Sequence, residues 1–132
     1  MNRIHGLMAL LATAVFATGA ALAGAKFTGS GDVLILLRAD QSGYASGFLG
    51  MIYNGAGMKQ WIGCQRSEND NVMCHANDES NTSVSCSVRS AYLAQSVSSL
   101  SPDARVIFYW NANGTCTRIQ VVHSSEYQDK QG

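Results

Sequence analysis

The fold is decided by the stretch QWIGCQRSENDNVMCHANDESNTSVSCSVR, which runs from Gln60 to Arg89. Three segments of it, 60–65, 71–76 and 82–89, are rich in strand-forming residues, and polar turn residues separate them at 67–70 and 77–81. Each segment carries one cysteine. The pattern predicts three consecutive strands joined by short turns.

The residues before this stretch predict further strands. Val33 to Leu37 is a continuous apolar run with turn residues on both sides, which favours a strand over a helical turn. From Gly43 to Gly57, five glycines are interleaved with apolar residues. Each glycine destabilises a helix by about 1 kcal/mol relative to alanine, so we expect one or two short strands here.

The residues after it predict a helix and a hairpin. Ser90 is a typical cap for a helix over Ala91–Leu100, in which apolar residues recur on one face. Pro102 cannot continue that helix. Arg105–Trp110 and Thr115–His123 then predict a β-hairpin around a loop that contains a glycine.

Together these elements predict an α+β domain with a mostly antiparallel sheet of five to seven strands and one short helix packed on a face. The alternative is an all-β sandwich with only a helical turn. A chain of this length suits a single domain with one modest core.

The first 23 residues have the features of a secretory signal peptide. Arg3 supplies positive charge, Leu7 to Ala20 is apolar and too short to span roughly 30 Å of hydrocarbon as a helix, and Ala21-Leu22-Ala23 ends the segment with small residues. Residues 24–132 are then one domain, secreted or periplasmic, with no membrane segment after cleavage.

Four cysteines follow, and an oxidising compartment favours two disulfides among them. Their spacing contains no close pair of the C-x₂-C type, so we expect no zinc site. Symmetric pairing about Asn69 favours a bond between Cys64 and Cys74, which leaves Cys86 for Cys116. The rival pairing, Cys74 with Cys86 and Cys64 with Cys116, also spans a hairpin-like turn and stays open.

Composition argues against several functions. Loss of Arg3 leaves eight basic and nine acidic residues, and this balance gives no reason to bind nucleic acid or an anionic membrane. No calcium loop, phosphate loop or cofactor motif is present in the sequence. The sequence predicts no catalytic, cofactor-binding or metal-ligating residues, and no cofactor.

A hydrolase would need a nucleophile, and the nearest candidate is Ser46, one position from the G-x-S-x-G spacing. His75 with Asp78 would complete a triad. Six aromatic side chains are a second candidate site, for a sugar or a peptide, although a short chain needs most of them in its core. They are Tyr44, Phe48, Tyr53, Trp61, Tyr109 and Trp110.

The motif Trp61-Ile62-Gly63-Cys64, the hairpin to Cys74, Val84-Ser85-Cys86 and Gly114-Thr115-Cys116 together resemble a group of small secreted bacterial proteins. These proteins share an aromatic-Ile-Gly-Cys motif, four cysteines and a C-terminal Gly-x-Cys β-hairpin. Their functions are uncharacterised, so the resemblance implies the compartment and the disulfides and no activity.

We therefore expect a secreted or periplasmic, non-enzymatic binding or interaction domain with a protein or saccharide partner. The alternatives are a small secreted hydrolase and an inhibitor of an extracellular enzyme.

We predict that export removes residues 1–23, because the Ala-x-Ala end is typical of a cleavage site. Intact-mass analysis of the exported protein is the measurement, with cleavage after Ala25 as the alternative outcome. Full-length protein in the membrane fraction would contradict the signal-peptide interpretation.

Overall fold

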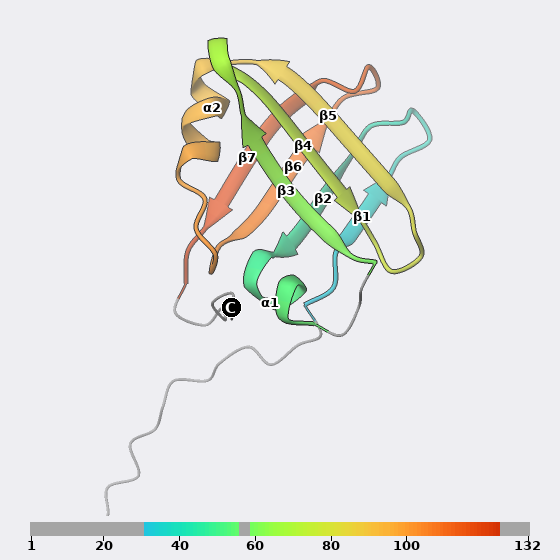
Figure 1. Ribbon diagram of the computed structural model, residues 1–132. Helices are drawn as coiled ribbons and strands as arrows, with labels where there is room; N and C mark the ends of the chain where they lie inside the picture. The colour runs from blue at the N-terminus through green and yellow to red at the C-terminus, as the bar shows by residue number, and fades with distance from the viewer. Residues whose placement is uncertain (1–30, 56–58, 125–132) are drawn as a thin grey trace, which may run out of the picture.

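The computed structural model describes residues 31–55 and 59–124, which form two antiparallel β-sheets that pack face to face around one core (Figure 1). The predicted signal peptide, residues 1–23, lies outside the described residues. The expected single sheet is therefore divided in two. The reason is that the inner faces of both groups of strands are apolar, and each covers the other.

The larger sheet has the strand order β1-β2-β6-β7, and every neighbouring pair is antiparallel. Its four strands are β1 (Leu34–Leu37), β2 (Gly43–Phe48), β6 (Arg105–Trp110) and β7 (Cys116–Val122). The predicted hairpin between the last two strands is confirmed, with a register shift at Tyr109/Trp110. Alternation along β6 buries Val106, Phe108 and Trp110 inside the molecule.

The smaller sheet confirms the three strands predicted from the cysteine-bearing stretch. It has the order β3-β4-β5, formed by β3 (Trp61–Arg66), β4 (Asn71–Asn77) and β5 (Ser83–Arg89). A 3-10 turn, η1 (Glu68–Asp70), joins the first two of these strands.

Helix α2 (Ala91–Ser98) confirms the predicted helix and its cap. Ser90 Oγ accepts a hydrogen bond from the backbone N–H of Leu93 at 3.3 Å. The buried face of α2 packs against β7, β3 and β4, so the helix closes one side of the space between the sheets (Figure 1).

Helix α1 (Leu49–Asn54) corrects the expectation of strands throughout the glycine-rich segment. Within its described residues, the strand is β2, in the first part of the segment. The backbone N–H of Leu49 donates to Ala104 O at 3.0 Å, and Gly50 and Met51 are buried. Tertiary packing therefore outweighs the low helix propensity of Gly50.

The structure contains the disulfides Cys64–Cys74 and Cys86–Cys116, which is the pairing favoured from the sequence. The first bond joins neighbouring strands within the smaller sheet, at a Cα–Cα distance of 4.0 Å. The second joins β5 to β7 and so connects the two sheets, at a Cα–Cα distance of 5.0 Å.

Within the residues described, no helix is both long and apolar enough to cross a membrane.

Candidate functional site

The three residues considered for a hydrolase are not brought together. Ser46 lies in β2 of the larger sheet, almost fully buried, and its hydroxyl accepts hydrogen bonds from the guanidinium of Arg105 at 2.9 and 3.0 Å. His75 lies in β4 of the other sheet, where its ring meets the edge of Trp61. Asp78 caps a turn by accepting a backbone hydrogen bond. These residues do not form a triad.

A different serine, aspartate and histidine do meet, at the end of the molecule where β7 stops. Ser101 Oγ donates to Asp103 Oδ1 and lies 3.0 Å from His123 Nδ1. The same ring nitrogen lies 4.0 Å from Asp103 Oδ1. The three side chains are partly exposed and form a chain of contacts between β7 and the loop before β6.

The order of this chain differs from that of a catalytic triad, in which histidine lies between the serine and the carboxylate. Here the serine lies in the middle and gives its one proton to Asp103. His123 Nδ1 therefore acts as the donor to Ser101 Oγ and does not take its proton. The arrangement joins the end of β7 to the loop before β6. Only the topology brings His123 to Ser101, so no sequence pattern could indicate the contact.

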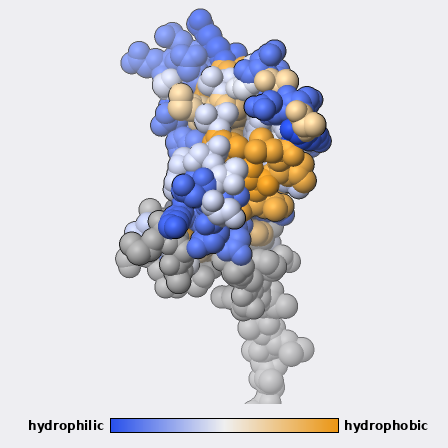
Figure 2. All heavy atoms as spheres, turned by 90° about the vertical axis from the view of Figure 1, so that its right-hand side faces the viewer, coloured by the Kyte–Doolittle hydropathy of each residue, from blue (hydrophilic) through white to orange (hydrophobic). Residues whose placement is uncertain are grey.

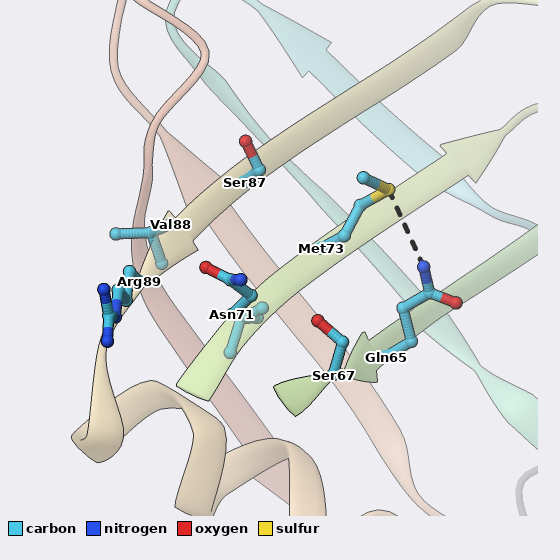
Figure 3. A pocket seen from close by; sticks show the side chains of 8 residues that line it. Gln65, Ser67, Asn71, Met73, Ser87, Val88 and Arg89 are labelled. Atoms are coloured by element: carbon cyan, nitrogen blue, oxygen red, sulfur yellow. Dashed lines mark hydrogen bonds between the residues drawn. The ribbon is translucent and has the colours of Figure 1, made fainter. Parts of the chain in front are cut away.

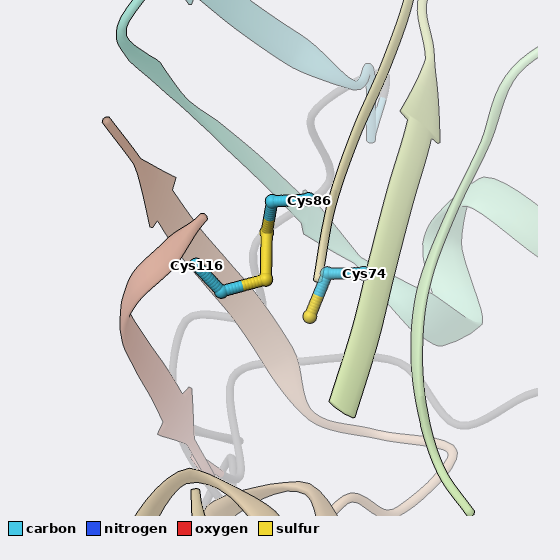
Figure 4. A group of neighbouring side chains, drawn as sticks. All are labelled: Cys74, Cys86 and Cys116. Atoms are coloured by element: carbon cyan, nitrogen blue, oxygen red, sulfur yellow. A yellow bond between two sulfur atoms is a disulfide. The ribbon is translucent and has the colours of Figure 1, made fainter. Parts of the chain in front are cut away.

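The cysteines form a cluster that their sequence spacing did not suggest. Cys64, Cys74 and Cys86 are directly opposite one another on three neighbouring strands. The sulfur atoms of Cys74, Cys86 and Cys116 lie within 4.8 Å of one another, and Figure 4 shows Cys74 beside the Cys86–Cys116 bond. Metal binding requires thiolates, and disulfide bonds leave none at these positions.

The outer face of the smaller sheet is polar. Its centre is a shallow hollow of about 370 Å³, in which Gln65, Met73 and Ser87 extend from three neighbouring strands (Figure 3). Gln65 Nε2 donates to the sulfur of Met73 at 3.8 Å. Met73 is the large apolar side chain exposed in this hollow.

A groove of about 420 Å³ lies beside α1. The exposed rings of Tyr53 and Trp61 give it an aromatic wall. Its polar group, Gln60, already bonds to the backbone N–H of Val33 and to the carboxylates of Asp32 and Glu79. The full lining consists of Leu49, Ile52, Tyr53, Gln60, Trp61, Ile62, Leu100, Ser101 and Pro102.

The expectation that most of the six aromatic residues form the core is wrong. Of those six, only Trp110 is buried. Tyr44, Phe48 and Tyr109 lie at alternate positions whose neighbours face inward, so strand alternation places them on the outer face of the larger sheet. The core consists instead of smaller side chains around Phe108.

These outward rings belong to a surface that we call the aromatic–arginine face. It covers the outer side of β1, β2, β6 and β7. Figure 2 shows a hydrophobic patch on the side of the molecule that carries β1, whose leucines Leu34 and Leu36 are 53% and 41% exposed. The face is formed by Leu34, Leu36, Tyr44, Phe48, Arg105, Ile107, Tyr109, Arg118, Gln120 and Val122.

Two arginines lie against aromatic rings on this face. The guanidinium of Arg118 lies 5.6 Å from the centre of the Tyr109 ring, and that of Arg105 lies 5.1 Å from the centre of the Phe48 ring. The rings of Tyr44 and Tyr109 pack beside each other, with 5.6 Å between their centres. The sequences of the four strands contain no aspartate or glutamate. The face is therefore apolar, aromatic and positively charged.

No protein-family model, curated protein or solved structure matches this chain. Of the resemblance drawn from the cysteine motifs, the structure shows the four cysteines and their two disulfides.

We predict that Ser101→Ala raises the pKa of Asp103. The hydrogen bond from Ser101 is the main cause that holds this pKa below its ordinary value, with smaller help from a backbone N–H and from His123. A depressed carboxyl pKa stabilises the fold at pH values above the pKa of the unfolded state, and that contribution is lost as pH falls through the folded pKa. Carboxyl NMR titration measures the change.

Asp40 is the matched control, because its pKa is lowered by a hydrogen bond from a different serine, Ser42. We expect the pKa of Asp40 to be unchanged in the Ser101→Ala variant. An unchanged pKa at Asp103 would contradict the arrangement described for this loop.

Proposed function

We propose that this chain is a secreted or periplasmic, non-enzymatic interaction domain that binds an acidic protein surface through the aromatic–arginine face. The observation that carries the proposal is the composition of this face. Tyrosine, phenylalanine and arginine gather on it, and aspartate, glutamate and lysine do not occur in its strands.

A protein partner suits this surface better than a small molecule does. Aromatic residues and arginine are enriched in protein interfaces, where aspartate, glutamate and lysine are depleted, and tyrosine and arginine are frequent hot spots. Small-molecule sites, in contrast, are concave. The aromatic–arginine face is the outer side of a β-sheet, and its extended strands offer a broad surface.

The charge of the face selects an acidic partner. Arg118 is exposed, and within the described residues its guanidinium has no carboxylate partner. The Tyr109 ring beneath it limits its motion, which reduces the entropy lost when a carboxylate binds. Arg105 is fixed in the same way by Phe48 and by Ser46.

The proposed compartment rests on the signal sequence and on two disulfides, which form in oxidising surroundings. A bacterial source and the α+β class remain parts of the proposal: the cysteine motifs support the first, and the packing of α2 supports the second. The inhibitor alternative is the case in which the acidic partner is an extracellular enzyme. The hydrolase alternative required Ser46 to lie beside His75, and the two residues lie in different sheets.

The test is selection of a phage-displayed library of random peptides on the mature chain, residues 24–132. We expect enriched peptides that combine aspartate or glutamate with apolar residues. Arg118→Glu weakens their binding by about thirtyfold, as loss of an interface hot spot does.

The matched control is Arg89→Glu. Arg89 is also exposed at the surface, but it lies on the smaller sheet, where its Nε donates to the carbonyl of Asn69. Its reversal leaves binding unchanged. Peptides without acidic residues, or equal losses from the two reversals, would contradict the proposal. A third outcome is that the chain binds neutral glycans on an array and that Trp61→Ala abolishes this binding. The binding site would then be the groove beside α1, and the proposal would be contradicted.

A further inference from the structure

β1 is an edge strand with an unusual amount of exposed apolar surface. Leu34, Leu36 and Leu37 are 53%, 41% and 53% exposed, and the strand pairs with β2 on one side only. Edge strands are usually protected by charged residues, proline or a bulge. The sequence of β1, Leu-Ile-Leu-Leu, has no charge and no proline, and its pairing with β2 is regular.

The hydrogen bonds of the hairpin establish which backbone groups of β1 face away from β2. Arg38 N donates to Ser42 O at 2.8 Å, so this pair is a hydrogen-bonded pair. Because such pairs alternate, Leu34 and Leu36 also bond to β2, whereas Ile35 and Leu37 direct their N–H and C=O groups outward. Val33 N points outward too, and it already donates to Gln60 Oε1 at 2.7 Å.

The sequence around this edge is complementary to itself. It reads Asp-Val-Leu-Ile-Leu-Leu-Arg from Asp32 to Arg38, with Ile35 at the centre and opposite charges at equal distances from it. When two such strands run antiparallel about Ile35, each Asp32 lies opposite the Arg38 of the other strand.

We propose that two copies of this chain form a dimer by antiparallel pairing of their β1 strands, centred on Ile35. The two Ile35 residues then form a hydrogen-bonded pair, because both direct their backbone groups outward. Leu37 N donates to the carbonyl of the second copy's Val33, and the Leu37 carbonyl replaces Gln60 Oε1 as the acceptor of that copy's Val33 N–H, so that the Gln60 side chain moves aside. Leu34 of each copy lies opposite Leu36 of the other.

The charged pairs select this register and this partner. Asp32 and Arg38 occupy non-hydrogen-bonded positions, in which opposed side chains are closest. A two-fold axis through the centre makes both ion pairs at once, which is the self-complementarity that a symmetric dimer requires.

This inference goes beyond the proposed function and does not depend on it. The dimer joins two larger sheets into one continuous sheet and places both aromatic–arginine faces on the same side. A partner with two acidic patches would then bind both faces with increased avidity.

The test is sedimentation velocity on the mature chain and on two charge-reversed variants. Wild type sediments as a dimer. Asp32→Arg and Arg38→Asp each place like charges opposite one another at two positions, and each raises the dimer dissociation constant roughly thirtyfold. An equimolar mixture of the two variants restores the dimer, because Arg at position 32 of one copy then faces Asp at position 38 of the other.

Restoration in the mixture also shows that both variants are folded. A wild-type monomer at every concentration would overturn the proposal, and so would a dimer that neither reversal weakens. A second measurement needs no variant: hydrogen exchange of the Ile35 amide slows as protein concentration rises. An Ile35 amide that exchanges at the same rate at all concentrations would contradict the pairing.

Discussion

The Cys86–Cys116 disulfide is a covalent link between the two sheets. It joins β5 of one sheet to β7 of the other, and both cysteines are buried, at 3% and 2% exposed. Beside it, Ser87 N donates to Gly114 O at 3.1 Å, which is the start of a parallel contact between the sheets. By loop entropy the bond contributes about 4 kcal/mol, a large share of the stability of a small domain. It holds together two sheets whose inner faces carry small side chains.

This constraint explains why the aromatic residues are free for another role. The space between the sheets is filled by alanine, valine, isoleucine and cysteine side chains, together with Phe108, Trp110 and the buried face of α2. Tyr44, Phe48 and Tyr109 are not needed there, and they lie outside, where their exposure does not stabilise the monomer. Under the proposed function, this exposed apolar surface is the interaction site. The free edge of β1 borders the same surface, so binding and self-association would use neighbouring parts of one sheet.

Much of the fold followed from local sequence signals. Alternating residues and polar turns predicted β3, β4, β5 and the β6–β7 hairpin, and Ser90 predicted the start of α2. The prediction of a strand around Gly50 was wrong, because the free-energy penalty for glycine in a helix is small compared with the packing that α1 gains. The division into two sheets was expected only under the alternative of a β-sandwich, since it depends on which strands face each other across the core. The prediction that the aromatic rings form the core was wrong for the same reason. Alternation predicts that neighbouring residues of a strand point in opposite directions, but it does not show which direction is inward.

The larger sheet leaves its outer face open to solvent. Paramagnetic relaxation of methyl signals by a neutral gadolinium chelate measures this directly. We expect strong relaxation for Leu34, Leu36 and Ile107, and weak relaxation for the buried methyl groups of Val72 and Val106. If the methyl group of Ile107 were as protected as that of Val106, this face would be covered, and it would not be available to a partner.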